Sequence, residues 1–170
     1  IGQNGLLITP ENGTFVFLGE IITDAGFDTV TQIPLPIFPN EPPACIGCGA
    51  CVSACPSGCL PDSKQNCLSA LTQKKGDLTN EEAHALRKGN LVWGCDACQL
   101  ACPFNQKVLA QKKDTPIPYF REERISKLTT ELLLSMSDEE FASRAFSWRG
   151  KAVILRNTSL FESSAERRKP

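Results

Sequence analysis

The chain has 170 residues, of which 41% are hydrophobic and 22% charged, and its formal net charge is −1. This length leaves room for one ordinary domain or two small ones. The near-zero charge gives no support for a strongly basic nucleic-acid-binding protein, although it does not exclude local basic patches. No apolar run reaches the ~18–20 residues of a membrane-spanning helix, so we predict no membrane partner.

Residues 1–33 carry the pattern of a β-hairpin. Apolar, β-branched runs at residues 6–9 and 14–18 flank an Asn-Gly pair, and Asn-Gly between two such runs is typical of a hairpin turn. From residue 34 to residue 44 five prolines predict an extended connector, which separates the hairpin from the next module.

Nine cysteines lie between residues 45 and 102, and seven of them form two related runs. The first run, from Cys45 to Pro56, has the C-x2-C-x2-C-x3-C-P spacing of bacterial-type iron–sulfur proteins. The second run, from Cys95 to Pro103, repeats that spacing without its opening cysteine, in whose place Val92 stands. The fourth cysteine of each run binds the other run's cluster in two-cluster ferredoxins. The spacing therefore predicts two [4Fe–4S] clusters, one of which needs a ligand from elsewhere.

A count of ligands assigns eight of the nine cysteines. Cys67 lies beyond a polar loop and can reach the cluster independently, so we assign it as the missing ligand. Cys59 lies four residues after Cys55, in a turn that leaves little chain to swing it round, and we leave it as a spare thiol. The predicted ligands of one cluster are Cys45, Cys48, Cys51 and Cys102, and those of the other are Cys55, Cys67, Cys95 and Cys98.

A disulfide framework and structural zinc are the competing interpretations of these cysteines. An odd number of cysteines argues against full pairing, and a chain with 41% hydrophobic residues does not need disulfide staples. Structural zinc sites typically use two separated C-x2-C pairs rather than a triplet that ends in Cys-Pro. Cluster thiolates must stay reduced, and the chain shows nothing like a signal peptide, so we predict a cytoplasmic protein.

Helices are predicted between and after the cysteine runs. Thr79 and Glu82 form a capping box, in which each residue satisfies a backbone N–H at the start of a helix. Ser137 and Glu140 repeat this pattern inside residues 125–160, whose apolar spacing is helical.

The second cysteine run and three further segments resemble one known family. Residues 93–105 read W-G-C-D-A-C-Q-L-A-C-P-F-N, which resembles the W-G-C-D-x-C-Q-x-x-C-P-x-N motif of epoxyqueuosine reductases. Residues 67–72 resemble that family's C-[IL]-S-x-L-T motif, whose cysteine supplies the displaced cluster ligand. Residues 1–8 and 17–21 resemble its I-G-K-N-x-L-L-I and F-L-G-E-I segments.

The resemblance implies a fold and an activity. Enzymes of this family reduce the epoxide of epoxyqueuosine in tRNA, the last step of queuosine synthesis, and join a cobalamin domain to a two-cluster ferredoxin module. We therefore expect an α+β fold, with a β-hairpin remnant of the cobalamin domain at 1–33, a bacterial-type two-[4Fe–4S] ferredoxin module at 45–110 and short α-helices at 111–170. Electrons would enter at the cluster of Cys45 and pass through the cluster of Cys67 to cobalamin.

The resemblance also implies contacts beyond the cysteines. The residues expected to face the corrin of cobalamin are Ser69, Asp96 and Leu18. The residues expected to meet the anticodon arm of tRNA are Gln73, Lys74 and Lys75, whose alternative interpretation is a solvated charged loop. A second basic stretch, residues 148–157, is compatible with phosphate contacts and equally with an ordinary amphipathic helix.

The sequence departs from the family in two respects. Gln3 stands where the family motif has Lys. The family's catalytic acid lies upstream of the segment that begins at Ile1, so we expect these 170 residues alone to bind clusters without reducing the epoxide. An external low-potential donor would supply the electrons, and we expect a monomer. The alternative function is a free two-[4Fe–4S] electron carrier of the ferredoxin type.

Overall fold

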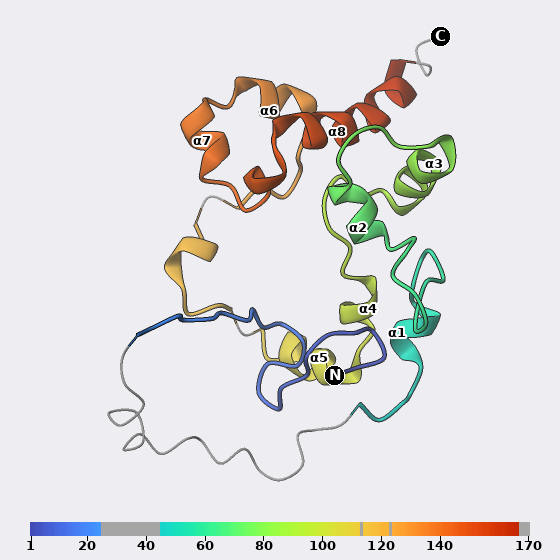
Figure 1. Ribbon diagram of the computed structural model, residues 1–170, viewed down its shortest axis with the longest axis vertical. Coiled ribbons are helices and arrows are strands. Elements are labelled where there is room, and N and C mark those ends of the chain that lie inside the picture. The colour runs from blue at the N-terminus through green and yellow to red at the C-terminus, as the bar shows by residue number, and fades with distance from the viewer. Residues whose placement is uncertain (25–44, 113, 123, 167–170) are drawn as a thin grey trace.

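Short helices make up most of the regular structure (Figure 1). The computed structural model describes residues 1–24, 45–112, 114–122 and 124–166, so the predicted connector at 34–44 lies outside the described residues. The α-helices are α1 (Ala50–Ser53), α2 (Leu68–Gln73), α3 (Asn80–Gly89), α4 (Ala97–Leu100), α5 (Pro103–Ala110), α6 (Thr130–Ser135), α7 (Asp138–Ala142) and α8 (Lys151–Glu166). The 3-10 helices are η2 (Pro118–Phe120) and η3 (Ser147–Arg149). None of the helices in this part of the chain is long and apolar enough to cross a membrane.

The predicted β-hairpin is wrong, and with it the α+β class. In the described residues no strand forms, and the pairing found there is a single antiparallel bridge between Thr9 and Gly13. The turn that contains Asn-Gly does close. Thr9 N donates to Gly13 O at 2.8 Å, and Gly13 N donates to Thr9 O at 3.0 Å. Beyond the bridge, Phe15 N donates back to Asn12 O at 3.0 Å and Thr14 N donates to a side chain of α5. A strand needs a continuous ladder, and the donors that would build it are used elsewhere.

Asn105 of α5 binds this N-terminal loop, which lies beside α5 in Figure 1. The side chain is fully buried; it accepts from Thr14 N at 2.7 Å and donates to Thr14 Oγ1 at 2.7 Å and to Gln99 O at 2.8 Å. Gly13 has a φ of +57°, and a Cβ at this position would collide with Asn105 Oδ1, so the close approach requires glycine. The loop is therefore attached directly to the helix that follows Cys102.

The long helix α8 joins two hydrophobic clusters, and it runs between α6 and α7 on one side and α2 and α3 on the other (Figure 1). Ile154 of α8 is fully buried in the first cluster, and Leu160 packs against the second. The buried members of the first cluster are Leu133, Met136, Phe141 and Ile154. Those of the second are Leu68, Leu71 and Leu86. Helix α8 contributes side chains to both clusters and so connects them.

Asn157 of α8 supplies hydrogen-bond donors to the last turn of α2 and to the loop before Cys95. Its side chain is fully buried and donates to Thr72 O at 2.7 Å and to Val92 O at 2.9 Å. The hydroxyl of Thr72 in turn accepts from Gly94 N at 3.1 Å. Buried carbonyls need partners, and Asn157 provides them for one carbonyl at the end of α2 and one in the loop after α3.

Both predicted capping boxes are confirmed. Thr79 caps α3 and Glu82 bonds back to the Thr79 N–H, and Ser137 and Glu140 do the same for α7. These helix starts are local, because the donors and acceptors lie three residues apart in the sequence.

We expect Asn157→Ala to lower the free energy of unfolding by about 2–4 kcal/mol, because it leaves the carbonyls of Thr72 and Val92 buried without donors. The matched control is Ser159→Ala, which removes an exposed 2.8 Å hydrogen bond to Arg156 O on the same helix and should cost less than ~0.5 kcal/mol. Urea unfolding of the anaerobically prepared protein measures both variants. Equal losses would contradict the role assigned to Asn157.

Candidate metal centres

The first set of cysteine side chains surrounds a small hollow beside α1 and α5. The cysteines that line it are Cys45, Cys48, Cys51 and Cys102. Cys51 on α1 and Cys102 at the N-cap of α5 are buried, with 8% and 9% of their surfaces exposed. Because α1 packs against α4 and α4 against α5, cysteines from both runs reach the same point.

The second set lines a larger cavity of about 860 Å³ next to α2. The cysteines in its wall are Cys55, Cys59, Cys67, Cys95 and Cys98. They come from the end of α1, the turn after it, the start of α2 and the start of α4. A cavity of this volume is in the range of ~300–1,000 Å³ that is usual for ligand and cofactor sites.

The chemistry of both sets suits iron–sulfur clusters. Thiolates are the ligands that such clusters use, and the first hollow contains no histidine or carboxylate among its lining residues. Within the described residues, no three histidine, cysteine or acidic side chains group closely enough to hold a single metal ion. A cube of four irons binds four thiolates at separate corners, and each of the two sets contains at least four cysteine thiols.

The thiols of the second set differ in how readily they ionise. Burial, and after it the neighbouring cysteines, raises the pKa of Cys98 to about 11. Burial also opposes ionisation of Cys55, but hydrogen bonds from Ser57 and Cys59 outweigh it and lower the pKa of Cys55 to about 7. Cys55 therefore forms a thiolate near neutral pH, whereas Cys98 stays protonated there.

Two of the three residues expected to face cobalamin lie in the wall of the second cavity. Ser69 on α2 accepts from Gln73 Nε2 at 3.2 Å, and Asp96 before α4 accepts from Gln99 Nε2 at 2.7 Å. Leu18 is 81% exposed and is not among the residues that line this cavity. The structure therefore brings Ser69 and Asp96 to the second thiol set and leaves Leu18 apart from it.

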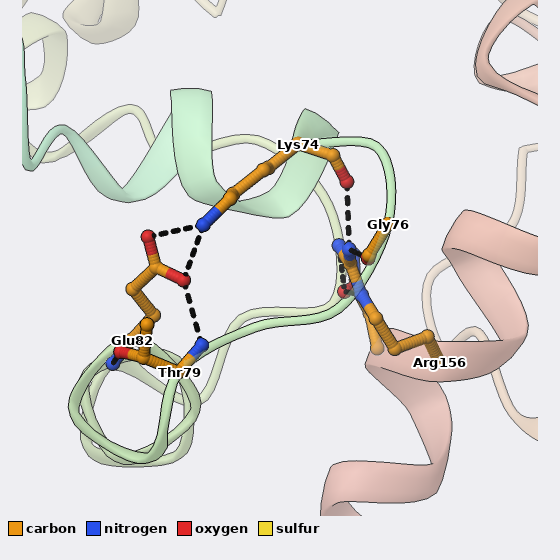
Figure 2. A network of polar contacts seen from close by, with 6 residues as sticks. Lys74, Gly76, Thr79, Glu82 and Arg156 are labelled. Atoms are coloured by element: carbon orange, nitrogen blue, oxygen red, sulfur yellow. Dashed lines mark hydrogen bonds and ion pairs between the residues drawn. The ribbon is translucent and has the colours of Figure 1, made fainter.

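The three residues expected to meet tRNA lie in the same cavity wall. Gln73, Lys74 and Lys75 form the end of α2 and the start of the loop that follows. Arg156 of α8 bonds to the backbone of this loop: its guanidinium group donates to Lys74 O at 2.7 Å and also to Gly76 O (Figure 2). The loop is thus attached to α8 through its carbonyls, and Lys74 and Lys75 line the cavity.

Lys74 is not a free cation. Its ammonium group donates to Glu82 Oε1 at 2.8 Å and to Oε2 at 2.7 Å, as Figure 2 shows, and this contact lowers the pKa of the Glu82 carboxyl group. Glu82 also accepts from Thr79 N, so the ion pair connects the loop to the capping box of α3. Lys75 is exposed. The two lysines therefore differ in the charge that they offer to a ligand.

Two further cations, Lys64 and Arg149, lie in the cavity wall, and neither was among the residues expected to contact cobalamin or tRNA. The Arg149 guanidinium lies 4.0 Å from the ring centroid of Trp148, which is 61% exposed, and its Nε is buried without a hydrogen-bond partner. Arg149 lies in the basic stretch 148–157, and the compatibility of that stretch with phosphate contacts was the sequence signal that could have identified it. No sequence signal marked Lys64.

Comparison with known proteins gives three findings. The family described as the 4Fe-4S double cluster binding domain matches residues 44–105. Epoxyqueuosine reductases from Staphylococcus aureus and Listeria monocytogenes are 34% and 37% identical over 170 and 166 residues, which are 94% and 92% of this chain and 40% of each relative. A crystal structure of epoxyqueuosine reductase with a tRNA-Tyr epoxyqueuosine-modified stem loop superposes with a TM-score of 0.62 at 34% identity, over 93% of this chain and 41% of that one.

The fold and the thiol sets define an iron–sulfur protein with a double-cluster domain. Over nearly its whole length the chain also matches one kind of enzyme. It belongs to the epoxyqueuosine reductase family, and it spans about 40% of the length of the curated relatives that it matches.

We expect iodoacetamide to label Cys55 much faster than Cys98 in the cluster-free protein. The thiolate is the reacting form, and the pKa values of the two thiols are about 7 and about 11. Because the Cys55 thiolate is lost as the pH falls through its pKa, lowering the pH from about 8 to about 6 should slow its labelling about tenfold. Mass spectrometry of the labelled peptides measures both rates. The unfolded protein is the control, in which the difference should disappear; a folded protein that labels both thiols equally would contradict the assignment.

Proposed function

We propose that this chain carries the electron relay of an enzyme that reduces epoxyqueuosine to queuosine in tRNA. The observation that supports this most directly is the second cavity. Its wall combines a set of cluster-type thiols with Ser69, Asp96 and the loop that begins at Gln73. Electron delivery, cofactor contact and substrate contact are thereby assigned to one continuous surface. The named activity of the relatives supports the same conclusion.

Two [4Fe–4S] clusters would be held by the cysteine sets. The ligands of the first would be Cys45, Cys48, Cys51 and Cys102. The ligands of the second would be Cys55, Cys67, Cys95 and Cys98. When bound, such clusters carry single electrons. The buried thiols of Cys51 and Cys102 keep water from the first site, which stabilises the bound group and tunes its potential.

Cobalamin would lie against Ser69 and Asp96. When bound, it supplies the low-potential centre that reduces the substrate. Ser69 and Asp96 both line the cavity. Ser69 accepts one hydrogen bond from Gln73, and Asp96 accepts one from Gln99. Such bonds hold polar groups in one rotamer, so the cavity presents a fixed hydroxyl and a fixed carboxylate. Leu18 stays a prediction, because it lies apart from this wall.

The tRNA anticodon arm would bind at the loop after α2. A solved relative is described with an epoxyqueuosine-modified tRNA stem loop, which supports tRNA as the partner. Lys75 is exposed, whereas Lys74 already neutralises part of the charge of Glu82. Arg156 fixes the loop carbonyls and so reduces the ordering that binding would require. The external electron donor, the cytoplasmic location and the monomeric state stay predictions.

For tRNA binding we expect a graded response. Lys75→Ala should weaken binding of the tRNA stem loop and reduce the salt slope of log K by about one unit, because one phosphate contact is lost. Lys74→Ala should do less, because its charge is offset by Glu82, and Glu82→Gln should strengthen binding. The control is Lys107→Ala, an exposed lysine outside the cavity wall. Fluorescence anisotropy over a salt series gives the slopes; an unchanged slope in Lys75→Ala would contradict the contact.

The function is tested in bacteria that lack their own epoxyqueuosine reductase. A chimaeric gene in which these residues replace the matching segment of a relative's epoxyqueuosine reductase should restore queuosine in tRNA, measured by mass spectrometry of digested nucleosides, whereas the 170 residues alone should not. The Cys67→Ser variant should leave epoxyqueuosine unreduced and lower the iron content of the purified protein from about eight to about four per chain, because one cluster loses a ligand. His84→Ala, at an exposed position of α3, should change neither. Restoration of queuosine by Cys67→Ser would overturn the relay.

A further inference from the structure

The second cavity contains one thiol more than a [4Fe–4S] cluster uses. Five cysteines line it, and a cube of four irons binds four thiolates. We infer that Cys59 is an alternate ligand, able to take the iron corner that Cys55 serves. This inference rests on the proposed ligand set of the second cluster and concerns a residue to which that set gives no role.

The distance between the two thiols identifies the shared corner. Cys55 Sγ and Cys59 Sγ lie 3.6 Å apart. Two thiolates bound to one tetrahedral metal at ~2.3 Å each would be separated by about 3.8 Å. Thiolates on different irons of a cube lie farther apart, because the irons occupy separate corners. The two thiols therefore lie where either Cys55 or Cys59, but not both, would hold one iron of the cluster.

The backbone between them explains why the turn presents both thiols on one side. Gly58 N donates to Cys55 O at 3.1 Å, and Gly58 has a φ of +62°, which reverses the chain within four residues. After Cys59 the side chains of residues 61–66 are all exposed. Movement of Cys59 toward the cavity therefore disturbs no packed core. From spacing alone the short turn predicts that Cys59 is a spare thiol, but in the structure this same turn brings Cys59 next to Cys55.

Cys67 has no comparable substitute. Cys67 precedes Leu68 at the start of α2, and Leu68 is 3% exposed in the hydrophobic core. Cys95 itself packs against that core. Those two positions are fixed by buried neighbours, so the alternate thiol serves the Cys55 corner alone.

The exchange is a ligand substitution and needs no oxidant or reductant. Cys59 would give up its thiol proton to hold the iron, and Cys55 would regain one on leaving it. The site would still supply four thiolates. A site of this kind retains its cluster when one ligand is lost to mutation or oxidation.

The experiment measures iron and acid-labile sulfide per chain after anaerobic reconstitution, together with the EPR spectrum of the reduced protein. Wild type and Cys59→Ala should each hold about eight irons. Cys55→Ala should also hold about eight, with an altered EPR signal, because Cys59 has taken the corner. The double variant and Cys67→Ala should fall to about four, with the first cluster retained as an internal check of folding.

A fall to about four irons in Cys55→Ala alone, or in Cys59→Ala alone, would overturn the inference. So would a Cys55–Cys59 disulfide in the anaerobically loaded wild type. If Cys55→Ala does not give folded protein by circular dichroism, Cys55→Val, which fills the space without a donor atom, is measured against the same iron counts. A wild type that never holds about eight irons would instead refute the proposed clusters themselves, so the two failures are distinguishable.

Discussion

The meeting of cysteines from two distant segments is the constraint on which the rest of the structure depends. Cys102 reaches the thiols of the first run, and Cys55 lies with those of the second, because α1, α4 and α5 pack in succession. Each thiol set contains cysteines from both runs, so the chain between the two runs must fold back on itself. The short helices α2 and α3 between the runs perform this return, and their apolar faces then need covering.

Helix α8 covers them and connects the cysteine module to the carboxyl-terminal helices. Its apolar side chains join two clusters, and its Arg156 and Asn157 side chains donate to carbonyls at the end of α2. The consequence for function lies in the loop after α2, which Arg156 fixes by its backbone while leaving its side chains at the cavity. A helix far along the chain therefore decides how rigidly the proposed tRNA-binding loop is presented.

Sequence-based prediction succeeded for features that are local or that depend on spacing alone. The capping boxes at Thr79 and Ser137 were predicted correctly, because donor and acceptor are three residues apart. The double-cluster domain was predicted from cysteine spacing and agrees with the family match. The β-hairpin failed although its Asn-Gly turn closes, because Asn105 of α5 accepts the Thr14 N–H. The sequence of residues 1–33 could not predict this hydrogen bond, because Asn105 lies 91 residues from Thr14.

The sequence by itself determined the inventory of thiols, the displaced position of Cys67 and the starts of two helices. Only the tertiary structure decided which side chains share a cavity. It placed Ser69, Asp96 and Lys75 with the second thiol set, left Leu18 outside, paired Lys74 with Glu82 and turned Cys59 toward Cys55. The physical reason is that spacing along a chain limits only what neighbours can do, whereas the partner of each buried or charged group depends on which distant elements pack against it.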